Sequence, residues 1–358
     1  MNLLTPFTLG SLTLSNRVVM APLTRRRAGE GKLPTALMAN YYAQRAGAGL
    51  IISEATEVDP RSIPDAPSRP GLFNAAQAQA WARVADEVHR AGGRIFVQLS
   101  HLGRASHPLL LVKGEQPVAP SAIAGKGVAF TREGPLPFPV PRALDIAEIC
   151  DVIDQFAVAA LLAREAGFDG VEIHAANGYL IDQFIRSGSN RRTDAYGGPV
   201  ENRTRLLLEV TEAVAALWGV DRVGVRLSPW SDFNGMSDED PLHTFCYAAE
   251  ALDQIGIAYL HLVEPAGQTP GLSPVLRQKF GGALIVAGGY GHETAEAAIE
   301  DGTTDLVAFG EGFIANPDLP ERFRLGLPLN TADRSTFYAG GATGYTDYPY
   351  LDAHQVLQ

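Results

Sequence analysis

Three side chains that can handle a proton or an oxygen atom lie close together in the stretch VEIHAANGYL, residues 171–180. His174, Asn177 and Tyr179 follow directly on a β-branched run that predicts a strand. An imidazole and an amide donate hydrogen bonds to a negatively charged oxygen, and a phenol also donates a proton. These residue types indicate a site for a substrate oxygen; the alternatives are a metal site and the top of a packed core.

The elements that must position these side chains follow from the hydrophobic pattern. Amphipathic helical patterns, for example residues 75–93 and 148–168, separate most of the apolar runs. Such an alternation predicts a parallel sheet covered by helices, and eight units in one domain spanning 1–358 fit a closed (β/α)₈ TIM barrel. A doubly wound open sheet is the alternative. The eight predicted strands are 17–23, 49–56, 94–100, 170–176, 223–229, 257–264, 284–289 and 305–311.

Two segments fall outside this alternation. Residues 7–16, FTLGSLTLSN, alternate around Gly10 and Ser11 and predict a β-hairpin that plugs the N-terminal mouth of the barrel. Residues 103–141 contain many Pro and Gly and form a long excursion after the third strand. We expect this excursion to lie over the other mouth as a lid or wall.

The carboxyl ends of barrel strands carry the chemistry in this fold, so their residues discriminate between reactions. A Schiff-base aldolase needs a strand-end lysine, but the four lysines all fall in predicted loops or helices. A metal-dependent barrel hydrolase needs ligands on the first strand, which has none, and we expect no metal. A retaining glycosidase needs two carboxylates, and residues 287–289 offer no partner for Glu172. What remains is a site for a planar polar group and an oxyanion.

Two glycine-containing turns, at 287–293 and 309–315, each lead from a predicted strand into a helix start. Free backbone N–H groups and the positive end of the helix dipole bind phosphate at such places. Ordinary turn chemistry is the alternative for either turn alone. Because strands seven and eight are the usual phosphate site of these barrels, the pair predicts a phosphate-bearing cofactor.

Composition limits the partners. The net charge of −11 repels phosphate backbones, which argues against nucleic acid and anionic membranes. No apolar run approaches the roughly 20 residues that span a bilayer. Two cysteines, Cys150 and Cys246, are too few for a disulfide framework, and we expect both to be small core residues in a cytoplasmic protein. Small molecules are the expected ligands.

The strand ends closely resemble those of the Old Yellow Enzyme family of flavin mononucleotide (FMN) ene-reductases. The resemblance covers essentially the whole chain, in a fixed order of motifs. It implies bound FMN, NADPH or NADH as hydride donor, and an α,β-unsaturated carbonyl or nitro compound as substrate. The matching motifs are NRVVMAPLTR (16–25), FVQL (96–99), HLGR (101–104), HAANGYLIDQF (174–184), DAYGGPVENRTR (194–205), VGVRLSP (223–229), FIANPDLPERF (313–323) and TFYAGGATGYTDYP (336–349).

The resemblance also implies roles for individual residues. His174 and Asn177 correspond to the pair that binds the substrate carbonyl, and Tyr179 to the acid that protonates the α-carbon after hydride reaches the β-carbon. Ser100 and Tyr338 correspond to positions that line the substrate pocket. The implied FMN contacts are Pro22, Leu23, Thr24, Ala55, Gln98, Arg226, Gly288, Gly289, Gly310, Glu311 and Phe337.

The chain departs from the family pattern at three places. Ser100 stands where the family commonly has a large aromatic residue, which predicts a larger pocket. Glu311 stands where the family usually has an arginine at the FMN phosphate, so we expect backbone N–H groups to bind the phosphate while the carboxylate turns away. The segment 59–71 lacks the usual aromatic residue.

The sequence therefore predicts a ping-pong NAD(P)H:ene-reductase, monomeric or homodimeric, in which one pocket serves both half-reactions. The alternative is a phosphate-binding barrel without redox chemistry, acting as an isomerase or as a binding protein.

Overall fold

Eight parallel strands close into a ring in the computed structural model, which describes residues 2–63, 69–264, 271–338 and 340–351. Each strand pairs with the next along the chain, and the eighth pairs with the first. The closed ring confirms the predicted barrel, and the doubly wound open sheet is wrong. The strands are β3 (Val18–Met20), β4 (Leu50–Ile52), β6 (Ile95–Ser100), β11 (Gly170–Ala175), β12 (Val223–Leu227), β13 (Tyr259–Val263), β14 (Ala283–Ala287) and β15 (Leu306–Phe309); β5 (Thr56–Glu57) extends the second.

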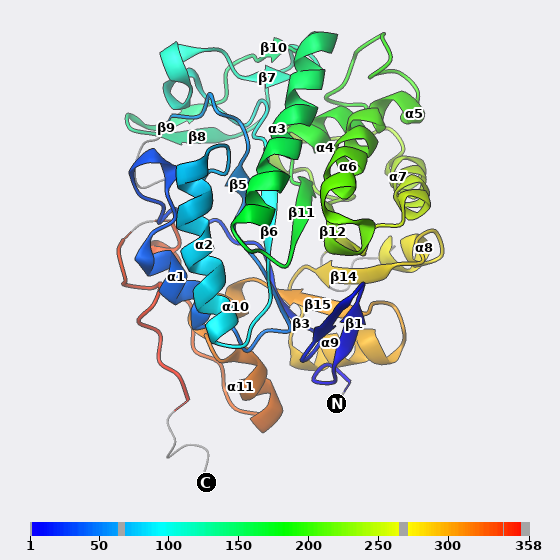
Figure 1. The fold of residues 1–358 in the computed structure, drawn as a ribbon. Helices are drawn as coiled ribbons and strands as arrows, with labels where there is room; N and C mark the ends of the chain where they lie inside the picture. Colours follow the sequence, from blue (N-terminus) through cyan, green and yellow to red (C-terminus); the bar gives the residue numbers. More distant parts are fainter. Residues whose placement is uncertain (1, 64–68, 265–270, 339, 352–358) are drawn as a thin grey trace.

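Helices surround the ring and begin where the sequence supplies caps (Figure 1). The Asn74 side chain accepts a hydrogen bond from the Gln77 N–H at the start of α2, and Asp145 forms a capping box with Glu148 on α3. The helices are α1 (Ala36–Ala43), α2 (Ala75–Arg90), α3 (Ile146–Glu165), α4 (Leu180–Ile185), α5 (Val200–Arg203), α6 (Arg205–Trp218), α7 (Pro241–Ile255), α8 (Ser273–Arg277), α9 (His292–Glu300), α10 (Glu311–Ala315) and α11 (Leu319–Leu325).

Alternate residues of the strands enter two separate cores, as the two-residue period of a strand requires. Val18 and Met20 of β3 pack in the cluster shared with the helices, whereas Val19 packs in the cluster inside the ring. Inward positions near the carboxyl ends of the strands carry polar side chains, so the barrel interior is apolar at one end and polar at the other.

The N-terminal hairpin closes the apolar end. Strands β1 (Phe7–Leu9) and β2 (Leu12–Leu14) pair antiparallel, and their buried leucines belong to the cluster inside the ring. Gly10 has φ +56°, and a Cβ there would lie 2.2 Å from the carbonyl oxygen of Asp221. The turn therefore requires glycine, and the predicted plug is confirmed.

The excursion lies at the other end of the molecule from the hairpin (Figure 1). The backbone N–H of Lys126 donates to the Asn234 carbonyl oxygen after β12, and the Arg26 guanidinium after β3 lies 6.0 Å from the Phe130 ring centroid. The excursion thus connects two loops at the carboxyl ends of the strands, as expected of a wall. It contains η2 (Pro108–Leu110), η3 (Val112–Gly114), β7 (Val118–Ala119), β8 (Val128–Thr131) and β9 (Gly134–Pro137), and β10 (Arg142–Ala143) follows it and pairs with β7.

The prediction that both cysteines are core residues is wrong for Cys150, which is exposed on α3, while Cys246 on α7 is half-buried. The buried face of α3 carries Ile149, Val152 and Phe156, so residue 150 lies on a different face of the helix.

Candidate active site

A carboxylate with three hydrogen-bond donors lies inside the polar end of the barrel. Glu172 is fully buried; its Oε1 accepts from Gln98 Nε2 at 2.7 Å, and its Oε2 lies 3.1 Å from the Tyr259 hydroxyl and 2.8 Å from His261 Nδ1. Arg226 pairs in register with both His174 and His261 and is also buried. The strand period brings Gln98 and Arg226 of the predicted flavin contacts to this layer of inward side chains.

His174 and Tyr179 lie against each other at the carboxyl end of β11. Their ring centroids are 4.9 Å apart in an edge-to-face arrangement, and His174 is buried. Asn177 lies between them in the chain with φ +57°, a left-handed conformation that asparagine tolerates better than most residues. The turn therefore brings the three predicted catalytic side chains to one strand end.

Buried polar contacts fix the backbone of this turn. The N–H of Asn177 donates to Ser228 Oγ at 2.7 Å, and the N–H of Gly178 donates to Asp182 Oδ2 at 2.8 Å. Asp182 also forms a buried ion pair with Arg186 at 2.9 Å, and Arg186 donates to the Ser228 carbonyl oxygen. The end of β11 is thereby attached to the end of β12, which limits movement of the catalytic side chains.

The protonation state of His174 follows from its surroundings. Burial, together with the positive charge of Arg226, holds its pKa well below the ordinary value of 6.5. The ring is therefore neutral at physiological pH, and its buried Nδ1 has no hydrogen-bond partner among the described residues. A neutral imidazole that donates from one nitrogen can bind a substrate oxygen without adding a full charge.

The loop after β3 carries Pro22, which is buried, and Leu23 and Thr24, which are half-buried. Glu54, before the predicted contact Ala55, is buried and accepts from the backbone N–H groups of Arg25 at 3.1 Å and Arg26 at 3.3 Å. Glu54 lies at the carboxyl end of the second predicted strand, but no role was predicted for it. Its carboxylate joins the ends of the first two barrel strands.

Arg25 attaches the C-terminal segment to the same loop. Its Nε donates to the Phe337 carbonyl oxygen at 3.0 Å, and another nitrogen donates to the Gly344 carbonyl oxygen at 2.8 Å. Phe337 is half-buried, whereas Tyr338 is 57% exposed. The structure thus places Phe337 beside the β3 loop, and Tyr338 is the more solvent-facing of the two predicted aromatic contacts.

The turns after β14 and β15 have the backbone that the phosphate prediction needs. Gly288 and Gly289 have φ +148° and +90°, and a Cβ at Gly289 would meet no atom within 4 Å. Gly310 precedes α10, and its position would bring a Cβ to 3.3 Å from Leu23. The open backbone at Gly289 fits a ligand group beside β14, whereas at Gly310 the absence of a side chain lets Leu23 pack closely.

Buried polar atoms provide a test of whether the site fits a flavin. Arg226 Nε, His174 Nδ1 and Ser100 Oγ are buried without a hydrogen-bond partner among the described residues. Buried polar groups are normally paired, so their alignment at the carboxyl end of the barrel indicates a polar ligand. A flavin with carbonyl and imide groups on its ring and a phosphate on its tail fits the donors and the glycine turns.

Comparisons with known proteins agree with this geometry. A family model described as the NADH:flavin oxidoreductase / NADH oxidase family matches residues 2–330. The chain is 44% identical over 372 residues to 12-oxophytodienoate reductase 2 of Arabidopsis thaliana, covering 98% of this chain and 96% of that protein. It is 43% identical over 356 residues to a probable flavin mononucleotide-dependent alkene reductase of Leishmania infantum, covering 98% and 97% of the two chains.

The solved structure of morphinone reductase in complex with tetrahydroNAD is similar throughout, with 49% identity, a TM-score of 0.95 and coverage of 99% of both chains. The chain belongs to the Old Yellow Enzyme family. As an Old Yellow Enzyme it is an FMN-dependent oxidoreductase that uses NAD(P)H to reduce activated C=C bonds. The alternative of a non-redox isomerase or binding protein is therefore wrong.

The described residues hold no group of three or more His, Cys, Asp or Glu side chains arranged to bind a metal ion. No helix within the described ranges is both long and apolar enough to cross a membrane.

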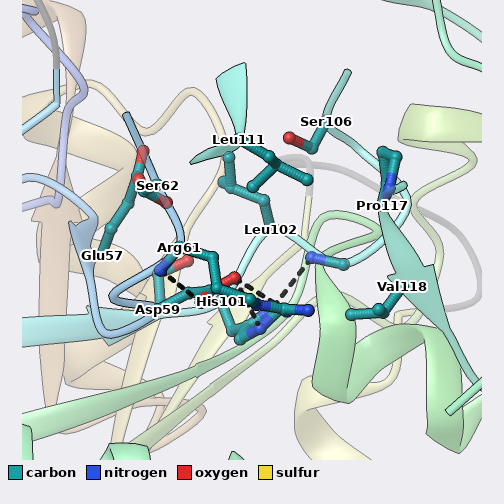
Figure 2. Close-up of a pocket in the computed structure, with 12 residues that line it drawn as sticks. Glu57, Asp59, Arg61, Ser62, His101, Leu102, Ser106, Leu111, Pro117 and Val118 are labelled. Atoms are coloured by element: carbon teal, nitrogen blue, oxygen red, sulfur yellow. Dashed lines mark hydrogen bonds and ion pairs between the residues drawn. The ribbon is translucent and has the colours of Figure 1, made fainter. Parts of the chain in front are cut away.

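Ser100, the first departure from the Old Yellow Enzyme pattern, borders a pocket under the excursion. The pocket is lined also by Asp59, Arg61, His101 and Ser106 (Figure 2). Arg61 and His101 contact the Asp59 carboxylate at 2.9 Å and 3.3 Å. This polar cluster occupies the wall beside the second and third strands; residues 64–68 of the divergent segment 59–71 lie outside the described residues.

Replacing Ser100 with tryptophan is expected to narrow the substrate range. The indole fills space at an inward position two residues beyond Gln98, so kcat/KM for bulky β-substituted enones should fall about tenfold or more relative to small enones. Ser100→Ala is the matched control because it removes the hydroxyl and adds no volume. An unchanged range and an unchanged product enantiomer in Ser100→Trp would show that residue 100 does not border the substrate.

Glu311, the second departure, turns to a basic neighbour. Its carboxylate lies 3.1 Å from the Arg334 guanidinium, and both side chains are exposed. Because the Glu311 carboxylate is paired with Arg334, a phosphate bound near Gly310 would depend on backbone N–H groups.

The variant Glu311→Arg is therefore expected to bind FMN about fivefold to tenfold more tightly, since a charge-assisted contact replaces a repulsive carboxylate. The FMN dissociation constant is measured by fluorescence in both proteins. Glu321→Arg is a matched control, because Glu321 pairs with Arg324 on α11 just as Glu311 pairs with Arg334. Equal tightening in both variants would mean that only net charge matters.

Proposed function

We propose that residues 1–358 act as one FMN-binding barrel domain in which a single pocket serves NAD(P)H and an α,β-unsaturated carbonyl or nitro compound in turn. The observation that carries the proposal is the turn at the end of β11. It holds a neutral His174, Asn177 and Tyr179 together beside the layer that contains Gln98 and Arg226.

His174 and Asn177 donate hydrogen bonds to the carbonyl or nitro oxygen of the substrate. Negative charge grows on that oxygen as hydride adds to the β-carbon, so both hydrogen bonds strengthen in the transition state. The network around Ser228 and Asp182 keeps the donors in place during this change. Tyr179 then donates its proton to the α-carbon, which gives the saturated product.

FMN bound here would supply the hydride-transfer chemistry between nicotinamide and substrate. Arg226 and Gln98 would bind the polar edge of its ring, and the guanidinium would stabilise negative charge there because arginine does not deprotonate. Gly288, Gly289, Gly310 and the N–H of Glu311 bind the phosphate. The remaining contacts that we assign to the flavin are Pro22, Leu23, Thr24, Ala55 and Phe337, and those assigned to substrate are Ser100 and Tyr338.

The purified protein tests this proposal directly. We expect a yellow protein that is bleached by NADPH or NADH without oxygen and regains its colour when a cyclic enone is added. Kinetics with both nicotinamides then give the preferred donor. A protein that takes up FMN but is not reoxidised by enones or nitroalkenes would contradict the proposed substrate class.

The setting of the enzyme is also a proposal. The net charge of −11 and the two unpaired cysteines support a cytoplasmic protein, monomeric or homodimeric, that binds neither nucleic acid nor membranes. Light scattering at micromolar concentration distinguishes the monomer from the homodimer.

A further inference from the structure

Glu172 is a buried charge with no part in hydride or proton transfer. It receives hydrogen bonds from Gln98, Tyr259 and His261, and all four side chains are buried. A buried carboxylate is costly unless it is paired. This one accepts a hydrogen bond from Gln98 and interacts with the charge of Arg226, the two side chains assigned to the polar edge of the flavin. Its position relative to Gln98 and Arg226 suggests two effects on the cofactor.

The first effect concerns the amide of Gln98. An ionised carboxylate accepts hydrogen bonds but donates none, so the amide atom that faces Glu172 must be the nitrogen. Paired register of Gln98 with Glu172 on adjacent strands keeps the two groups together. The Gln98 carbonyl oxygen is thereby left as an acceptor for a donor outside the network, such as the imide N–H of a flavin ring.

The second effect concerns charge. Burial alone would raise the pKa of Glu172, but hydrogen bonds from His261 and Gln98 and the charge of Arg226 lower it below its ordinary value, so the group is ionised. Burial lowers the pKa of His261, which makes that ring neutral at physiological pH. Arg226 and Glu172 therefore carry opposite charges that cancel, with His174 and His261 neutral beside them.

We propose that Glu172 is a positioning residue that fixes the amide orientation of Gln98 and offsets the charge of Arg226, and so limits how strongly the site favours reduced, anionic flavin. This inference rests on the proposed placement of FMN. Without the Glu172 charge, the Arg226 cation acts on the flavin uncompensated. In the interior, where screening is weak, a charge of this kind changes an equilibrium by about tenfold or more.

The decisive variant is Glu172→Gln, which keeps the shape and removes the charge. The holoenzyme is equilibrated with a reference dye of known potential, and the ratio of reduced to oxidised FMN is read from absorption. We expect this ratio to rise about tenfold when the potential of the solution is fixed. Such a rise means that the flavin potential has become more positive. Tyr259→Phe removes one donor from Glu172 without changing charge, and we expect a change below about threefold.

A second variant separates the two effects and does not depend on Glu172→Gln folding. Glu172→Asp keeps the charge but withdraws the carboxylate from Gln98, so FMN should bind more weakly while the potential stays within about threefold. An unchanged potential in Glu172→Gln, or a shift as large in Glu172→Asp, would overturn the charge effect. Unchanged FMN affinity in Glu172→Asp would overturn the orientation effect.

Arg226→Gln distinguishes failure of this inference from failure of the proposed site. It should make the flavin potential more negative, because the cation near the ring is lost. If Arg226→Gln shifts the potential and Glu172→Gln does not, the flavin site stands and the role of Glu172 is wrong. If neither variant shifts it, the placement of the flavin beside Arg226 is wrong.

Discussion

The variant Tyr179→Phe is expected to slow reduction of a cyclic enone by about 10²- to 10⁴-fold while reduction of the enzyme by NADPH stays nearly unchanged. In the proposed mechanism the phenol donates a proton only to the substrate carbon, and the first half-reaction requires no such proton. Phenylalanine keeps the ring that packs edge-to-face on His174, so the geometry of the turn is retained. Anaerobic stopped-flow absorption measures each half-reaction separately.

His174→Ala and Asn177→Ala provide the comparison. Each removes a proposed donor to the substrate oxygen, so each should slow enone reduction by about 10²- to 10³-fold and weaken the binding of phenolate ligands. Because we propose that the nicotinamide uses the same pocket, these two variants should also slow the first half-reaction. Small and equal effects of all three variants on both half-reactions would contradict the assigned roles.

Glu54→Gln is expected to change how stability depends on pH. Burial raises the pKa of Glu54 to about 7, although hydrogen bonds from the Arg25 and Arg26 N–H groups lower it. Between the ordinary value of 4.5 and about 7, the folded protein holds a proton that the unfolded chain has lost. This group therefore makes the wild type lose stability as pH rises through that window, by about 3 kcal/mol in all.

The measurement is the free energy of unfolding of the apoprotein in urea at several pH values from 4.5 to 8. The free energy of unfolding of Glu54→Gln minus that of wild type should rise by about 3 kcal/mol across the window and stay constant above it. Glu57→Gln is the matched control. Burial alone would raise the pKa of Glu57, but Lys32 and Arg69 lower it. The free energy of unfolding of Glu57→Gln minus that of wild type should therefore not rise with pH. Parallel curves for Glu54→Gln and wild type would place the Glu54 pKa in its ordinary range.

Much of the architecture could be predicted because it depends on short-range patterns. The two-residue period of the strands and the caps of α2 and α3 are visible in the sequence, and the hairpin turn follows from Gly10. The conformation and contacts of residues 103–141 could not be predicted in the same way. They depend on partners far away in the sequence, such as Asn234, and no local sequence pattern links Asn234 to Lys126.

The candidate site was predicted to the extent that its residues belong to motifs at strand ends. Glu172 was weighed only as a glycosidase carboxylate, and Tyr259 and His261 were not singled out at all. A signal for Glu172 was present in the sequence, since Glu172 and His174 are two residues apart and must share a face of the strand. What the sequence lacked was the register that places Gln98 and His261 at the same carboxylate.

The attachment of Phe337 and Gly344 to the β3 loop determines when this contact is completed during synthesis. Arg25 and its acceptor at Phe337 are 312 residues apart. At about 5 to 20 residues per second, a ribosome needs between about 15 and 60 s to make the intervening chain. Throughout that interval the first barrel strand exists without the backbone carbonyls that receive its arginine. Any FMN binding that depends on this contact must therefore follow translation of residue 337.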